Sequence, residues 1–148
     1  MMKSVLQTHS LRQIVGQLLD NCFEVLKAFL EQAIQHDEVQ PENIIQINKD
    51  LMGAISFYIS NYDFIQEQTH SNSKFLRNLL FEIKHYRNNW AHSQDFSLRE
   101  VHRIADTILL MFDELSLNIS NEVYLFVNQI RMESIQIMSL QLQQSQKY

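Results

Sequence analysis

Apolar residues recur every three or four positions along most of the chain, the spacing that gathers them on one face of an α-helix. The first such stretch runs from about Ser10 to Gln35, and either Ser10 or Thr8 can cap its start. A second begins at Pro41, a residue suited to the first turn of a helix, and fades near Asn61. We therefore expect two helices before the middle of the chain.

A polar stretch separates these helices from the rest of the sequence. Residues 66–73 contain no apolar side chain and predict a loop. A third helix is expected after the cap candidates Ser71 to Ser73, because helical apolar spacing then continues to about Trp90. A short turn from Ala91 to Phe96 would end it.

The fourth helix has a marked start, because Ser97 and Glu100 form the Ser-x-x-Glu capping box whose two side chains satisfy each other's free amides. A fifth helix is expected from about Asn121 into the Gln-rich end, and its last turns, residues 140–148, should fray. Short links between these helices predict an all-α fold, a four- to five-helix bundle that forms one domain over residues 1–148.

The composition agrees with this fold class and excludes several others. Two glycines and one proline are too few for the tight turns of a β-sandwich or barrel, or for a Gly-rich phosphate-binding loop. The single cysteine, Cys22, excludes an internal disulfide, and its apolar helical surroundings predict a role in core packing. No window approaches 18 unbroken apolar residues, and the start lacks the apolar core of a signal peptide. We therefore expect no membrane segment and a cytoplasmic location.

Charge is distributed unevenly along the chain. The net charge is −5, which by itself argues against binding to nucleic acid. Residues 74–103, however, hold six of the twelve Lys and Arg residues against three acidic residues, a local net charge of +3. This window could be a chance cluster on solvated helix faces, or a patch that faces phosphate groups on an otherwise acidic protein.

The third helix contains an arginine in an unexpected position. A helical projection at about 100° per residue gathers its apolar residues in one stripe, and Arg87 falls near the middle of that stripe. The members of the stripe are Leu76, Leu79, Leu80, Ile83 and Trp90. An arginine on a core-facing stripe is either paired with a buried carboxylate or placed at the edge of a groove. The sequence leaves both alternatives open.

His92 follows Arg87 by five residues, at the expected junction between helix and turn. The C-terminus of a helix favours a protonated imidazole. A histidine can take up or release a proton, and an arginine can stabilise the charge that develops on phosphate oxygens. These two residues together are a minimal set for cleaving a phosphodiester without a metal ion or cofactor.

The segment around these residues resembles a known family motif. Arg87-Asn88, followed by Ala91-His92, is similar to the Arg-Asn-x-x-Ala-His form of the motif of the HEPN superfamily. Within that superfamily the segment resembles the HEPN domain of a eukaryotic nuclear RNA quality-control endonuclease, a domain that recurs in bacterial toxin and defence proteins. The similarity extends over roughly residues 76–115.

The resemblance implies a helical bundle that forms a homodimer, with two Arg/His pairs meeting in one composite cleft. Family members with an intact motif are typically metal-independent endoribonucleases that use the ribose 2′-hydroxyl and leave a 2′,3′-cyclic phosphate. By position, His92 would be the general acid and base, Arg87 would stabilise the phosphate, and Asn88 would orient it. We expect RNA contacts from the nearby residues Lys84, Arg77 and His85.

The resemblance also bears on possible partners. Toxins of this family that are silenced by nucleotidylation carry a tyrosine two residues after the histidine, where this chain has Gln94. An antitoxin of that kind is therefore not expected, although another antitoxin or a protein of a defence complex remains a candidate partner. The main function predicted is a toxin or antiphage effector that cuts RNA.

Two other interpretations remain open. The chain could be a non-catalytic HEPN module that dimerises or holds a partner within a defence or regulatory complex. It could also be a purely structural domain in which Arg87 belongs to a buried ion pair. A di-iron site is not favoured, because Glu82 and His85 of the Glu-x-x-His pattern project away from the apolar stripe.

Overall fold

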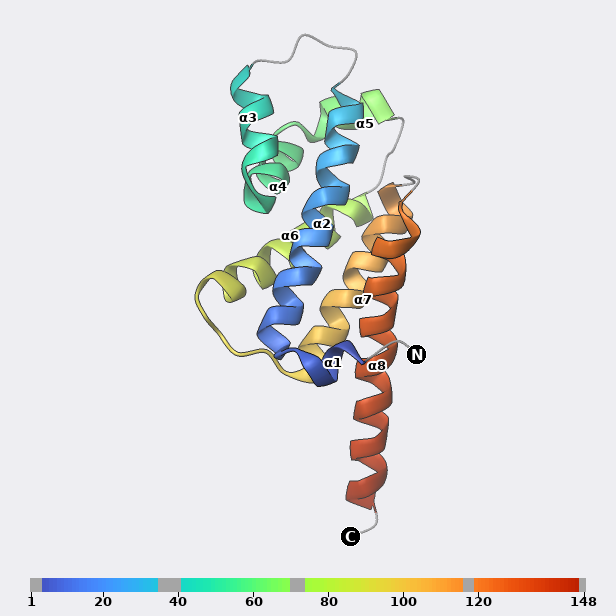
Figure 1. The fold of residues 1–148 in the computed structure, drawn as a ribbon. Coiled ribbons are helices and arrows are strands. Elements are labelled where there is room, and N and C mark those ends of the chain that lie inside the picture. Colours follow the sequence, from blue (N-terminus) through green and yellow to red (C-terminus); the bar gives the residue numbers. More distant parts are fainter. Residues whose placement is uncertain (1–3, 35–40, 70–73, 116–118, 147–148) are drawn as a thin grey trace.

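The protein is all-helical. The computed structural model describes residues 4–34, 41–69, 74–115 and 119–146, and these residues form eight α-helices and no strand (Figure 1). The helices are α1 (Val5–Thr8), α2 (Leu11–Ala33), α3 (Pro41–Lys49), α4 (Leu51–Ser60), α5 (Tyr62–Thr69), α6 (Lys74–Ala91), α7 (Leu98–Leu115) and α8 (Asn121–Gln146). The predicted all-α class is confirmed.

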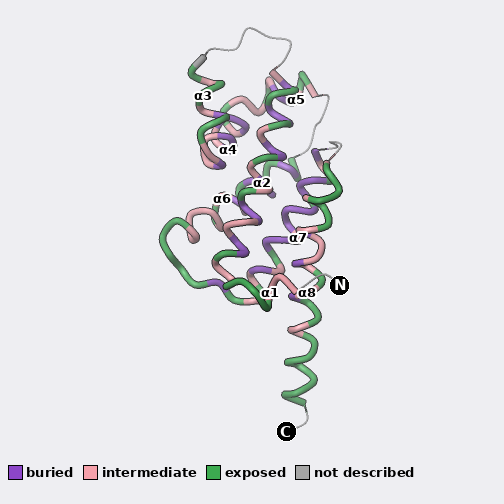
Figure 2. The backbone as a smooth tube through the Cα atoms, viewed as in Figure 1, coloured by how far each residue is buried: buried purple, intermediate pink, exposed green. Residues whose placement is uncertain are grey.

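The long helices α2, α6, α7 and α8 form the body of the molecule. Helix α7 packs against α2, α6 and α8, while α3, α4 and α5 lie around the C-terminal half of α2 (Figure 1). Buried residues lie along the inner faces of these helices (Figure 2), and their side chains form one hydrophobic core. Helix α8 continues beyond the rest of the bundle, and its last seven described residues are all exposed. The fraying expected over residues 140–148 stays a prediction.

Two helix starts carry capping boxes, one at Ser97 as predicted and one at Ser10, which was one of two predicted cap residues. The Ser10 side chain accepts a hydrogen bond from the Gln13 amide at 3.2 Å, and the Gln13 side chain accepts one from the Ser10 amide at 2.9 Å. The same reciprocal pair joins Ser97 and Glu100 at 3.0 and 3.1 Å. Both boxes satisfy amides that a helix leaves free at its start. The short helix α1 was not predicted from the sequence.

The expected single helix from Pro41 to Asn61 is instead broken at Asp50. Asp50 has extended backbone angles and caps α4 by accepting a hydrogen bond from the Gly53 amide at 2.7 Å. A β-carbon on Gly53 would lie 2.2 Å from the Gln46 carbonyl oxygen of α3. The break therefore depends on a capping aspartate and on a glycine that lets two backbones approach closely.

The loop expected over residues 66–73 begins later than predicted. Gln66 to Thr69 form the last turn of α5, and residues 70–73 lie outside the described part of the chain. Helix α5 is held by Ile65, which is 1% exposed, and the Thr69 hydroxyl donates to the Ile65 carbonyl at 2.7 Å. The buried residue Ile65 thus supports α5, and the helix continues into residues 66–69, which have no apolar side chain.

Cys22 lies in the core, as predicted. Its side chain is fully buried in α2, and its Sγ atom lies 3.6 Å from Sδ of Met111 on α7. Burial raises the pKa of the Cys22 thiol to about 12. The thiol therefore stays protonated and unreactive in the folded protein.

None of the helices in the described ranges has both the length and the apolar character needed to cross a membrane.

Candidate active site

The predicted site lies at the C-terminal end of α6, where the helix ends in a defined hydrogen-bonded turn. The Gln94 amide donates to the Asn89 carbonyl at 3.1 Å, and the Ser93 amide donates to the Trp90 carbonyl at 3.2 Å. Ser93 has a φ of 58°, in the left-handed region. This is the Schellman arrangement, in which the residue after the C-cap turns the chain away from the helix axis.

His92 is the C-cap residue of this turn. Its amide still donates to the Asn88 carbonyl at 3.0 Å, so its backbone is fixed by the last helical hydrogen bond. Its side chain is exposed. An imidazole in this position is open to solvent and to any ligand that approaches the end of α6.

Arg87 lies one turn earlier and lines a cavity between α6, α2 and the break between α3 and α4. The cavity has a volume of about 280 Å³. Its other lining residues are Gly16, Leu19, Asp20, Phe23, Lys49, Asp50, Leu51 and Trp90. Arg87 is half-buried and forms no hydrogen bond or ion pair with any residue in the described ranges. Of the two alternatives left open by the sequence, the structure places Arg87 at a cavity and not in a buried ion pair.

The formal charges around this cavity balance. Arg87 and Lys49 contribute two positive charges, while Asp20 and Asp50 contribute two negative charges. One oxygen of Asp50 is already engaged by the Gly53 amide, at 2.7 Å. The guanidinium of Arg87 keeps its donors available, and a planar fork of donors suits two oxygens of a phosphate or carboxylate.

Arg12 and Trp90 fix the end of α6 against the start of α2. An Nη2 donor of Arg12 reaches the Trp90 carbonyl at 2.6 Å, and Nε1 of Trp90 donates to the Arg12 carbonyl at 3.2 Å. The guanidinium of Arg12 also stacks on the indole ring, 5.0 Å from its centroid. A β-carbon on Gly16 would lie 3.3 Å from the indole nitrogen, so the absence of a side chain there lets the indole pack closely on α2. This clamp sets the positions of Arg87 and His92 on either side of Trp90.

The remaining candidate residues follow α6 outward from the cavity. Asn88 is half-buried, and within the described ranges its side chain forms no hydrogen bond. Lys84 is also half-buried. His85 is exposed, and its Nε2 atom lies 3.3 Å from the side-chain nitrogen of Asn89. None of these three candidates lines the cavity that contains Arg87.

Arg77 is further from the site. Ten residues of α-helix separate it from Arg87, about 15 Å along the helix axis. Its guanidinium stacks on two aromatic rings, 5.1 Å from the centroid of Tyr62 and 5.8 Å from that of Phe81. An RNA contact by Arg77 therefore requires a ligand that extends along much of α6.

Another cation of the basic window, Arg103, is neutralised within the protein. Its guanidinium binds both oxygens of Glu82, with Nη2 at 2.9 Å and Nε at 3.2 Å, and the Thr107 hydroxyl donates to the same carboxylate. Burial alone would raise the pKa of Glu82, but the hydrogen bonds from Arg103, Thr107 and Tyr86 and the charge of Arg103 hold it below its usual value. Glu82 is thus a structural residue that joins α6 to α7.

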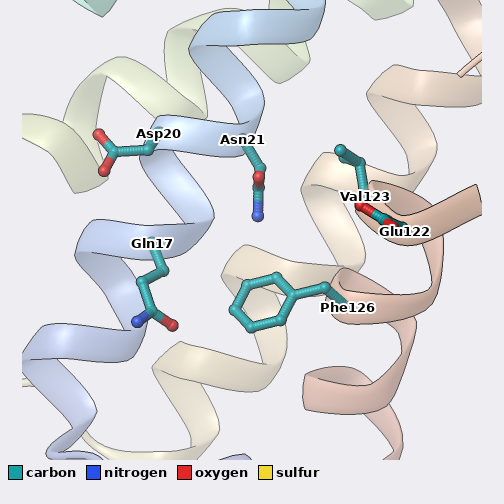
Figure 3. Close-up of a pocket in the computed structure, with 6 residues that line it drawn as sticks. All are labelled: Gln17, Asp20, Asn21, Glu122, Val123 and Phe126. Atoms are coloured by element: carbon teal, nitrogen blue, oxygen red, sulfur yellow. The ribbon is translucent and has the colours of Figure 1, made fainter. Parts of the chain in front are cut away.

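A second cavity, of about 440 Å³, lies on another face of α2, toward the start of α8 (Figure 3). Its lining is Gln17, Asp20, Asn21, Glu122, Val123 and Phe126. Figure 3 shows Phe126 extending from α8 toward α2, while Asp20 points away from it. This lining contains two carboxylates and no cation, so it does not suit a phosphate. In the described ranges, no three His, Cys, Asp or Glu side chains are grouped closely enough to hold a metal ion.

The structure brings the predicted residues together only in part. Arg87 lines a cavity, whereas His92 lies outside that lining, at the end of the same helix. Sequence reasoning missed Arg12 and Lys49. The Arg12 contact joins residues 78 positions apart and uses a backbone carbonyl of α6, so no side-chain pattern could reveal it. Lys49 reaches the cavity through the break at Asp50, which the apolar periodicity did not predict.

Comparisons with known proteins add no assignment, because no family model, curated protein or solved structure matches this chain.

Proposed function

We propose that this protein is a metal-independent endoribonuclease of the HEPN type. In this proposal Arg87 binds the scissile phosphate, Asn88 helps to orient it, and His92 transfers protons. The proposal rests on the Arg87-to-His92 motif and on the all-helical fold. Its main support is that the half-buried guanidinium of Arg87 forms no hydrogen bond or ion pair with any described residue. A half-buried guanidinium without a partner among the described residues is costly, and a bound anion would complete its hydrogen bonds.

The proposed reaction is transesterification within the RNA strand. The ribose 2′-oxygen gives up its proton to a base and forms a bond to phosphorus, while the bond from phosphorus to the 5′-oxygen breaks. The leaving 5′-oxygen takes a proton from an acid. The products are a 2′,3′-cyclic phosphate and a 5′-hydroxyl, and DNA is not cut because it lacks the attacking group. Arg87 would stabilise the negative charge that grows on the phosphorus oxygens.

Two imidazoles serve this reaction better than one, because one acts as the base and the other as the acid. Each chain supplies a single His92, and this residue does not line the Arg87 cavity of its own chain. We therefore propose that two copies form the complete site. Lys84, His85 and Arg77 would then contact more distant phosphates along α6.

The test is cleavage of total RNA and of tRNA by the purified protein in EDTA, with analysis of the fragment ends. The wild type should leave cyclic phosphate ends. His92→Ala should lower the rate by about 10²- to 10⁴-fold, the usual contribution of a general acid or base. Arg87→Lys should keep some activity because lysine retains the positive charge. Its activity should stay below that of the wild type because lysine lacks the planar fork of donors.

A matched control is His9→Ala, which removes an exposed histidine outside the predicted site. This variant should cut at the wild-type rate. If His92→Ala and the wild type cut equally, the role assigned to His92 is wrong. In cells, the same comparison tests the proposed toxin or antiphage role, because expression of the wild type should arrest growth and His92→Ala should relieve the arrest.

A second candidate function is a non-catalytic module that dimerises or holds a protein partner. The exposed apolar side chains along α8 favour it, since they offer a surface for association. Under this alternative neither the wild type nor His92→Ala would cut RNA.

A further inference from the structure

Helix α8 carries a row of apolar side chains on the face turned away from the bundle. Leu125, Met132, Ile135 and Leu142 are 55%, 46%, 46% and 62% exposed. On a helix of about 100° per residue, Leu125 and Met132 lie opposite the buried residues Val127, Ile130 and Ser134, which face α7, while Ile135 and Leu142 lie at the side of that buried face. Helix α8 is thus apolar on two faces, and the bundle covers only one of them.

The four residues follow the repeat of a helix-pairing seam. Their spacings are seven, three and seven residues, which are those of the a and d positions of a heptad. The intervening a and d positions are held by Asn128 and Ser139. We name these six residues the α8 seam.

The pattern of apolar and polar residues in the α8 seam is the same in both directions. Its centre lies between residues 133 and 134. Counted outward from there, Met132 mirrors Ile135, Asn128 mirrors Ser139, and Leu125 mirrors Leu142. A seam with this symmetry is complementary to a second copy of itself in the opposite direction, because apolar residues meet apolar residues and polar meet polar. A two-fold interface requires this self-complementarity.

We propose that two copies of this chain pair through α8, with the two helices antiparallel and centred on that point. Met132 of each copy then packs on Ile135 of the other, and Leu125 packs on Leu142. The pairing from Leu125 to Leu142 extends over about 27 Å of helix. This surface is inferred from α8 alone and does not depend on the proposed nuclease activity.

Charge and shape favour a second copy over other occupants. Residues 134–146 contain no charged side chain, so in the antiparallel pair they place no like charge against Glu122, Arg131 or Glu133 of the other copy. A helix that binds a lipid surface usually carries Lys and Arg on its polar face, and this segment has none. A hollow of about 570 Å³ lies beside the seam, between α8 and the start of α7. Leu98, Ile135, Met138 and Leu142 contribute its apolar lining, and it can receive Leu125 and Met132 of the second copy.

The first test measures the mass of the full chain in solution by light scattering and sedimentation over a range of concentrations. The wild type should be a dimer. Met132→Glu and Ile135→Lys should each weaken the dimer by at least about 100-fold, because each places a charge against an apolar partner. Both side chains are about half exposed, so circular dichroism should show folded monomers.

The mixture of these two variants tests the direction of pairing. In an antiparallel pair, Glu at position 132 of one copy faces Lys at position 135 of the other, and a mixed dimer should form. In a parallel pair, position 132 would face position 132, and mixing would restore nothing. The matched control is Leu140→Glu, which charges a residue of α8 that is 58% exposed but lies off the seam. It should remain dimeric.

Three results would overturn the proposal: a monomeric wild type, a dimer that survives Met132→Glu, or a mixture of the two variants that stays monomeric. These measurements follow mass and not RNA cleavage. A protein that cuts RNA without pairing through α8, or that pairs and does not cut, would therefore separate this proposal from the proposed function.

Discussion

At the scale of the residue, Arg87 places a charged group at a cavity whose lining is partly apolar. Its neighbours in the cavity include Leu19, Phe23 and Leu51, and no described residue accepts a hydrogen bond from it. Functional sites often keep such residues at the expense of stability. The position of Arg87 in the apolar stripe of α6 leaves the packing there incomplete, and the proposed function gives a reason for it.

Arg87→Leu should raise the free energy of unfolding by about 1 kcal/mol, because a leucine can bury its side chain against the apolar lining of the cavity. Urea unfolding measures this change. The matched variant is Arg103→Leu, which removes the partner of Glu82 and should lower stability. A loss of several kcal/mol in Arg87→Leu would instead indicate that Arg87 belongs to a buried ion pair.

Gly53 is a second residue at which a small change should have a large effect. Gly53→Ala should lower the free energy of unfolding by about 1–3 kcal/mol, because its β-carbon would lie 2.2 Å from the Gln46 carbonyl oxygen. Urea unfolding measures this loss. The control is Ser60→Ala, an exposed position at the end of the same helix, which should change stability little. Equal stability of the wild type and Gly53→Ala would mean that α3 and α4 are not held this closely.

At the scale of the element, the bidentate pair between Glu82 and Arg103 joins α6 to α7. The pKa of Glu82 is held below its usual value, about 4.5, so its carboxylate stabilises the folded state at any pH above that value. This contribution is lost as the pH falls through the lower pKa of the folded state. The stability that the pair supplies should therefore disappear in acid.

Glu82→Gln should melt at a lower temperature than the wild type at pH 7, and the difference should shrink as the pH falls below about 4.5. Thermal unfolding from pH 7 to pH 3 measures it. The control is Glu24→Gln, which removes the ion pair between an exposed glutamate and Lys27 and should change little at any pH. A difference that stays constant with pH would show that the Glu82 charge is not its source.

The ends of the helices were predictable where the signal was local. The capping boxes at Ser10 and Ser97 involve residues three positions apart, so the sequence placed both starts within a residue. The break at Asp50 was missed because it depends on Gly53 approaching the backbone of another helix, a contact that periodicity does not register. Helix α5 was missed because one buried residue, Ile65, holds it to the core.

At the scale of the whole molecule, the candidate site could be predicted along one helix but not across helices. The apolar stripe identified Arg87, and the capping box after the turn identified the end of α6 near His92. The wall of the cavity comes from α2 and from the residues around Asp50, and these distant segments carry no shared pattern. Likewise, the apolar spacing of α8 predicted a helix, but only the structure shows which of its faces remains uncovered.

The buried position of Cys22 has a practical consequence for every comparison of variants. An alkylating reagent reacts with the thiolate of an accessible cysteine, and the only cysteine of this chain is closed off between α2 and α7. Alkylation must therefore wait until the two helices separate, and its rate, divided by that of the unfolded chain, gives the equilibrium for opening. Mass spectrometry of the alkylated protein can therefore measure this opening equilibrium in native buffer, without denaturant.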